Sequence, residues 1–123
     1  MELEDISFKV IGAAIEVHQH LGAGLFESAY QECLDHELKS RGLFVEKELV
    51  LPIKYKNIEI DRGYRVDLMV EGKLIVENKT VESFNSVHVA QLLTYLKFTG
   101  CSLGLLINWR STTLSKGIKR VIL

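Results

Sequence analysis

The chain has 123 residues, 47% hydrophobic and 25% charged, which is the size and composition of one ordinary globular domain spanning residues 1–123. Its formal net charge of −1 argues against strong nonspecific binding to nucleic acid, although a local basic groove remains compatible with it. No apolar run is long enough for a membrane span, no signal-peptide pattern is present, and the two cysteines lack metal or redox spacing. We therefore expect a cytoplasmic protein with reduced thiols and no membrane partner.

Two helices are predicted at the start of the chain. Apolar residues recur at helical spacing over residues 5–20, with Asp5 as the N-cap, and again over residues 25–40. Glycines at positions 22 and 24 separate the two helices, and Gly42 fits the position just after the second.

The second predicted helix carries a charged residue on its apolar side. Glu27 lies three residues before Tyr30 and seven before Leu34, so it shares their stripe, whereas Gln31 and Asp35 should face solvent. A plain alternative is a first-turn glutamate that the helix dipole favours.

Three strands are predicted next. Residues 43–55 alternate between apolar and polar, and Pro52 within them indicates an edge strand or a bulge because proline cannot donate to a ladder. Residues 64–70 and 73–79 then form a hairpin around Gly72.

Charges in this hairpin stand where apolar residues are expected: Asp67 in the first strand, Glu77 and Lys79 in the second. Pairing Met69 with Lys73 across a three-residue connection separates polar from apolar residues best, because a slip of one residue would exchange the faces. This register puts Arg65, Asp67, Met69, Lys73, Ile75, Glu77 and Lys79 on one face, and Val66, Leu68, Val70, Leu74, Val76 and Asn78 on the other.

The remaining chain predicts a helix over residues 87–99, capped by Ser86 and closed by Gly100, then a buried strand over residues 103–108 and a short final strand. The helical connection makes strands 73–79 and 103–108 candidates for a parallel pair. The expected fold class is α/β, or more narrowly α+β, with helices packed on a mixed sheet.

The candidate chemistry is that of a hard cation. Asp67, Glu77 and Glu27 offer oxygen ligands suited to Mg²⁺ or Mn²⁺, and the backbone carbonyl of Asn78 could add another. Lys79 shares the strand face of Glu77 and could act on an attacking water or stabilise phosphate charge. The alternative is a structural salt bridge between Lys79 and a carboxylate.

Four short motifs resemble those of the PD-(D/E)XK nuclease superfamily, and more closely its small GxxExxY proteins. They are Gly24-Leu-Phe-Glu27-Ser-Ala-Tyr30, Tyr64-Arg-Val-Asp67, Glu77-Asn-Lys79 and Gln91-Leu-Leu-Thr-Tyr95, and together they span most of the chain. The last is similar to the QxxxY motif of the RecB-type and lambda-exonuclease-like branch. Two positions depart from the usual pattern: Val66 replaces a proline, and Asn78 replaces an apolar residue.

The resemblance implies a restriction-endonuclease-like αβββαβ core with an extra N-terminal helix. It implies that Glu27, Asp67 and Glu77 bind a divalent metal and that Lys79 acts on the attacking water. Gln91 and Tyr95 would line the site.

The expected activity is hydrolysis of DNA phosphodiester bonds, with Arg65, Lys73 and Tyr95 as contacts to nucleic acid. Lys54, Lys56 and Lys97 are further candidates for contacts to the DNA backbone. Two other hypotheses stay open: a catalytically silent binding or assembly module on a nuclease fold, and a homo-oligomer whose hairpin charges form interface salt bridges.

Overall fold

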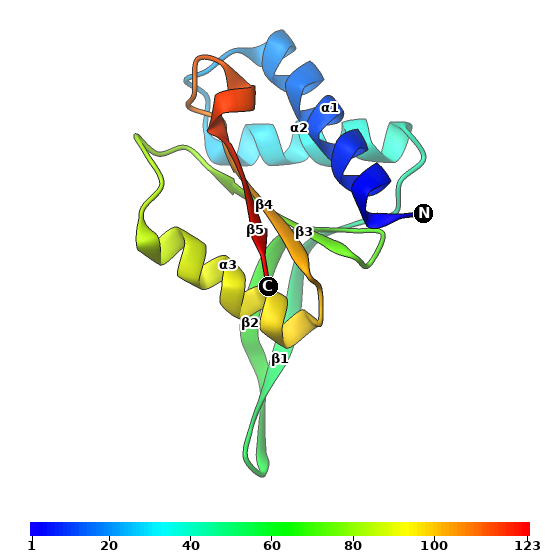
Figure 1. Ribbon diagram of the computed structural model, residues 1–123, viewed down its shortest axis with the longest axis vertical. Coiled ribbons are helices and arrows are strands. Elements are labelled where there is room, and N and C mark those ends of the chain that lie inside the picture. Colours follow the sequence, from blue (N-terminus) through cyan, green and yellow to red (C-terminus); the bar gives the residue numbers. More distant parts are fainter.

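The computed structural model describes residues 1–123, and Figure 1 shows helices on both faces of one sheet. In chain order the elements are α1 (Leu3–Leu21), α2 (Glu27–Ser40), β1 (Val45–Tyr55), β2 (Ile58–Val70), β3 (Leu74–Lys79), α3 (Ser86–Thr99), β4 (Leu103–Asn108), the 3-10 helix η1 (Leu114–Gly117) and β5 (Ile118–Ile122). This order confirms the predicted mixed α/β fold, including the extra N-terminal helix and the final strand.

The five strands lie side by side in the order β1-β2-β3-β4-β5. β3 and β4 run parallel, as the helical connection between them predicts, and the other neighbouring pairs are antiparallel. None of the helices is both long and apolar enough to cross a membrane.

Two apolar cores hold the helices on the sheet. The larger joins α1 and α2 to one face and includes Tyr30, Leu34, Leu68, Leu74 and Trp109. The smaller joins α3 to the other face and includes Val66, Met69, Ile75, Leu92 and Leu96. Both cores therefore reach β2 and β3, the strands that carry the predicted site.

The helix ends differ in part from the prediction. Gly42 ends α2 as expected, with a φ of 85° and with the N–H of Leu43 bonded to the carbonyl of Leu38 at 3.1 Å. Asp5 is not an N-cap, because α1 begins at Leu3 without a side-chain cap. Asn85 caps α3 instead of Ser86, because its side chain accepts bonds from the N–H groups of Val87 and His88.

β1 and β2 form a long hairpin that projects beyond the rest of the molecule (Figure 1). The prediction for Pro52 is confirmed: β1 is an edge strand, and its register with β2 shifts between Leu51 and Ile53. We call residues 52–65, the outer part of this hairpin, the arm.

The predicted register of β2 and β3 is wrong, because each residue of β2 lies opposite a residue two positions further along β3 than predicted. Val70 lies opposite Leu74 rather than Met69 opposite Lys73, because Glu71 and Gly72 both turn at positive φ and the Lys73 N–H bonds to the Val70 carbonyl at 3.0 Å. The shift is even, so it preserves which residues share a face.

One face assignment does change. Val66 packs in the α3 core, whereas Leu68, two residues later, packs in the core of α1 and α2. The prediction placed both on the same face, and it failed because it assumed unbroken alternation through Asp67.

Candidate functional site

The sheet is interrupted at Asp67. The ladder between β2 and β3 ends at Leu68 and Val76, just before Asp67 and Glu77 would face each other. In β1 the residue opposite Asp67 is Glu48. Its φ of 53° is a backbone conformation that residues other than glycine rarely adopt. Both strands thus lose regular alternation at the same level, since Val45 and Leu68 pack in one core and Leu49 and Val66 in the other.

Two carboxylates replace the ladder hydrogen bonds that the gap removes. The N–H of Asp67 donates to Glu77 Oε2 at 2.8 Å, and the N–H of Asn78 donates to Asp67 Oδ2 at 2.8 Å. In a strand the N–H and C=O of one residue point to the same neighbour, so the Asn78 carbonyl also faces this gap. The gap therefore brings together two carboxylates and one backbone carbonyl.

Burial makes these carboxylates reluctant to ionise. Glu77 is only 3% exposed, and burial followed by the charge of Asp67 raises its pKa to about 8. Burial also raises the pKa of Asp67, against the opposing effects of the Asn78 hydrogen bond and of Lys79. A cation in the gap would offset this cost.

Glu27, the first residue of α2, lies close enough to the gap for the charges there to shift its pKa. Burial and the charge of Asp67 raise its pKa, while Lys79 and a backbone hydrogen bond from Thr80 lower it. Lys79 itself forms no ion pair. The four salt bridges of the molecule all join other residues. The alternative of a structural salt bridge at Lys79 is therefore not what the structure contains.

Tyr95 of α3 approaches the gap from the other side of the sheet. Burial and the charges of Glu77 and Asp67 raise its pKa, and its ring stacks on Tyr64 with centroids 5.1 Å apart. Arg65 lies near enough to Asp67 and Tyr95 for its charge to oppose, in part, the rise in the pKa of both.

Two predicted site residues are not drawn into the gap. Gln91 is exposed on α3, one helical turn before Tyr95, and makes no side-chain hydrogen bond. Lys73 lies at the turn end of the β2–β3 hairpin, where its Nζ donates to the carbonyl of Met1 at 2.9 Å. Their predicted roles stay predictions.

A chain of polar side chains behind the gap, buried from Trp109 to Gln31 and ending at the exposed Glu48, was missed by sequence reasoning. Trp109 Nε1 donates to Asn78 Oδ1 at 2.9 Å, Asn78 Nδ2 to Gln31 Oε1 at 3.4 Å, and Gln31 Nε2 to Glu48 Oε1 at 3.4 Å. Gln31 was expected to face solvent, but it is only 7% exposed because its side of α2 lies over the sheet. The buried Asn78 was the available signal, since a buried amide requires polar partners.

Asp35 corrects the same prediction, because it too was expected to face solvent and is only 7% exposed. Its carboxylate pairs with Lys39 at 3.1 Å, one helical turn later.

Tyr30 fixes the segment that precedes Glu27. Its hydroxyl donates to the Gly22 carbonyl and accepts from the N–H of Leu25 at 3.1 Å. Its ring stacks on Trp109 with centroids 4.9 Å apart and planes 9° from parallel. Through Trp109 and Asn78, the start of α2 is therefore connected to the strand that carries Glu77.

The donor chemistry of the gap fits a hard divalent cation, since carboxylate and carbonyl oxygens are the ligands that Mg²⁺ and Mn²⁺ prefer. As the side chains are placed, however, no group of three or more His, Cys, Asp or Glu residues is arranged to hold a metal ion. Glu27 is thus near Asp67 and Glu77 but does not converge with them on a common point.

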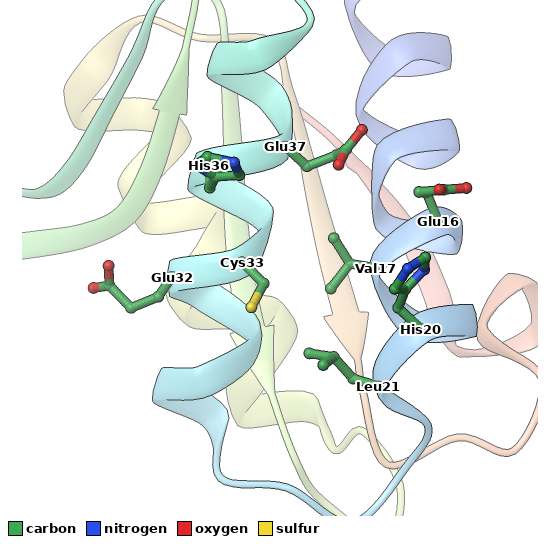
Figure 2. Close-up of a pocket in the computed structure, with 8 residues that line it drawn as sticks. All are labelled: Glu16, Val17, His20, Leu21, Glu32, Cys33, His36 and Glu37. Atoms are coloured by element: carbon green, nitrogen blue, oxygen red, sulfur yellow. The ribbon is translucent and has the colours of Figure 1, made fainter.

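A separate cleft of about 400 Å³ lies between α1 and α2, away from this gap (Figure 2). Val17, His20 and Leu21 of α1 face Cys33 and Glu37 of α2 across it. It contains none of the predicted site residues.

The protein is thus a mixed α/β protein whose sheet is interrupted at a polar gap. A family model described as "PD-(D/E)XK nuclease superfamily" matches residues 4–121, so the chain belongs to this superfamily. The match confirms the resemblance at the superfamily level; the GxxExxY group and the QxxxY branch stay predictions. No curated protein and no solved structure matches the chain.

Proposed function

We propose that this protein is a divalent-metal-dependent nuclease that hydrolyses phosphodiester bonds of DNA. The observation that carries the proposal is the pair Asp67 and Glu77, two adjacent, largely buried carboxylates with no ion-pair partner at a break in the sheet. Such a pair is costly to keep ionised without a cation, and carboxylates whose pKa is strongly raised by burial and by a like charge are candidates for a functional site.

In this proposal Asp67, Glu77 and the Asn78 carbonyl hold Mg²⁺ or Mn²⁺. Glu27, whose pKa responds to the charges of Asp67 and Lys79, would complete the set through its side chain. The bound cation would neutralise charge on the scissile phosphate and make a nearby water more acidic. Occupation of the site ionises Glu77, because the cation favours the charged carboxylate.

Lys79 and Tyr95 would act on the substrate side. The Lys79 ammonium, which no carboxylate pairs, can bond to a phosphate oxygen or position the attacking water. The Tyr95 hydroxyl lies within the field of both carboxylates and can donate to phosphate. Gln91, one turn earlier, would contact the DNA strand, together with Arg65 and Lys73.

The test is cleavage of labelled single- and double-stranded DNA by the purified protein with Mg²⁺ or Mn²⁺. Asp67→Ala, Glu77→Ala and Lys79→Ala should each lose at least about 100-fold in rate, since each removes charge stabilisation from the reaction. Glu16→Ala on α1 and Lys116→Ala on η1, which remove exposed charges outside the gap and the hairpins, serve as matched controls. If Asp67→Ala and Lys79→Ala cleave DNA at the same rate as the wild-type protein, the assigned site is wrong.

A second candidate is a catalytically silent binding or assembly module. The lack of a converged three-ligand group favours it. In that case the protein would bind DNA without cutting it in either metal, and the three site substitutions would leave DNA affinity unchanged.

A further inference from the structure

A further cleft, of about 320 Å³ and with a largely apolar lining, lies between β1, β2 and the end of α3. Residues of three elements line it. They are Leu49, Leu51 and Pro52 of β1, Tyr64 and Met69 of β2, and Phe98 and Thr99 of α3, together with Glu46 and Gly72. Glu46 is the one charged residue in this lining, so the cleft offers no cation to a phosphate.

Stacked aromatic rings connect this cleft to the carboxylates. Tyr95, whose pKa responds to Glu77 and Asp67, stacks on Tyr64 at 5.1 Å, and Tyr64 contacts Phe98 with centroids 5.8 Å apart. Phe98 is 43% exposed, so part of its ring face is open to the solvent at the cleft. The rings of Tyr95 and Tyr64 therefore lie between the carboxylates of the gap and Phe98 of the cleft.

The arm continues from the cleft with a different charge from the rest of the chain. It carries four cations, Lys54, Lys56, Arg62 and Arg65, against the two carboxylates Glu59 and Asp61, whereas the whole chain has a net charge of −1. None of these six residues forms a salt bridge.

The arm also presents an apolar face. Ile53 pairs with Ile60, and Tyr55 with Ile58, so their side chains share one side of the ribbon. Ile58 and Tyr55 are 54% and 58% exposed, and Lys56 Nζ lies 5.3 Å from the Tyr55 ring centroid. Exposed aromatic residues beside unpaired cations match the two parts of a nucleotide, its base and its phosphate.

We propose that this cleft binds an unpaired base of single-stranded DNA, and that the neighbouring phosphates lie along the cations of the arm. An apolar, aromatic-walled recess without a cation fits a base face rather than a phosphate. Bases in a duplex are already stacked on one another, so only an unpaired base can enter. A second copy of the chain fits less well, because protein interfaces are depleted in lysine, which the arm concentrates next to its apolar face.

The binding test needs no catalysis. Fluorescence anisotropy in EDTA would compare a labelled 12-nucleotide single strand with the corresponding duplex. The single strand should bind more tightly, and Phe98→Ala should weaken its binding by roughly 5- to 100-fold, as expected for loss of one stacked base. Phe98→Trp should retain the affinity, which also shows that the position tolerates substitution without unfolding.

Matched variants separate the cleft from general exposure. Phe8→Ala removes a phenylalanine that is 81% exposed on α1 and should leave the affinity unchanged. Lys54→Glu with Lys56→Glu should weaken binding and reduce its salt dependence, whereas Lys116→Glu with Lys119→Glu should have a smaller effect. A 2-aminopurine in the strand should be quenched by the wild-type protein and not by Phe98→Ala.

Equal affinity for duplex and single strand together with a neutral Phe98→Ala would overturn the proposal. So would a concentration-dependent dimer in sedimentation that Phe98→Ala dissociates without loss of DNA binding. The role of the cleft in cleavage rests on the proposed function. Because binding is measured in EDTA, failure of Asp67→Ala to affect cleavage would reject the catalytic site alone and leave the binding result standing.

Discussion

The two ends of the β2–β3 hairpin are built on different principles. At the turn end, Leu68, Met69 and Val70 pair in regular register with residues 74–76, and all six side chains are buried and apolar. At the next position beyond Leu68 and Val76, Asp67 and Glu77 stand in a gap where their carboxylates accept the hydrogen bonds of the opposite strand.

The difference shows how one hairpin combines an end that stabilises the fold with an end that costs stability. The apolar end anchors both cores, and its burial drives folding. The polar end tolerates buried carboxylates whose cost must be met by the rest of the fold, as is common at functional sites. Substitutions at the two ends should therefore have opposite effects on the free energy of unfolding.

The largest effect on stability should come from the turn end. Leu74→Ala removes a fully buried side chain from the larger core and should lower the free energy of unfolding by about 2–5 kcal/mol. Urea denaturation would measure the loss. Ile122→Ala, at a side chain that is 68% exposed, is the control and should change stability by less than about 0.5 kcal/mol.

The polar end should respond in the opposite direction. Glu77→Gln keeps an acceptor for the Asp67 N–H but removes a buried charge, so at pH 8.5 it should raise the free energy of unfolding by roughly 1–3 kcal/mol. It should also weaken Mn²⁺ binding strongly, as measured by calorimetry. A destabilised variant that still binds Mn²⁺ would contradict the division between the two ends.

Much of this contrast was accessible in the sequence. Asp67, Glu77 and Lys79 occupy positions where strand alternation calls for apolar residues, and parity alone placed them together. The parallel pairing of β3 with β4 followed from the length of the helical connection.

The interruption itself was not accessible, because it depends on two strands at once. Glu48 takes a positive φ opposite Asp67, and no local pattern in residues 45–55 indicates it. The burial of Gln31 likewise depends on how α2 lies over the sheet, which the helical period alone does not determine.

Stability should depend on pH in a direction set by the same carboxylates. The pKa of Glu77 is about 8 in the folded protein against 4.5 when unfolded, so between these values the folded state holds a proton that the unfolded state has lost. The free energy of unfolding should therefore fall as pH rises through this window, by at most about 1.4 kcal/mol per pH unit for this one proton. The raised pKa values of Asp67 and Glu27 act in the same direction.

Urea denaturation between pH 5 and pH 8.5 would measure this slope. Glu77→Gln should flatten it, and Mn²⁺ should counteract the loss because it binds the ionised carboxylates. A wild-type stability that rises across the window would contradict the assignment of Glu77 as the buried acid.

The smallest effect should come from the contact that joins α2 to the connection between α1 and α2. Tyr30→Phe keeps the ring on Trp109 but removes the hydroxyl that bonds to Gly22 and Leu25, at a cost of about 1 kcal/mol. Thermal unfolding and the emission of Trp109, the single tryptophan, would report it. Tyr55→Phe, on the exposed arm, should be neutral.

The central claim is that the break in the sheet is a divalent cation site. A crystal soaked in Mn²⁺, with data collected to record the anomalous signal of manganese, tests it most directly. We predict an anomalous peak bound by the carboxylates of Asp67 and Glu77 and by the carbonyl of Asn78. A peak found only elsewhere, for example beside His20 in the cleft between α1 and α2, or no peak at the break, would contradict the claim.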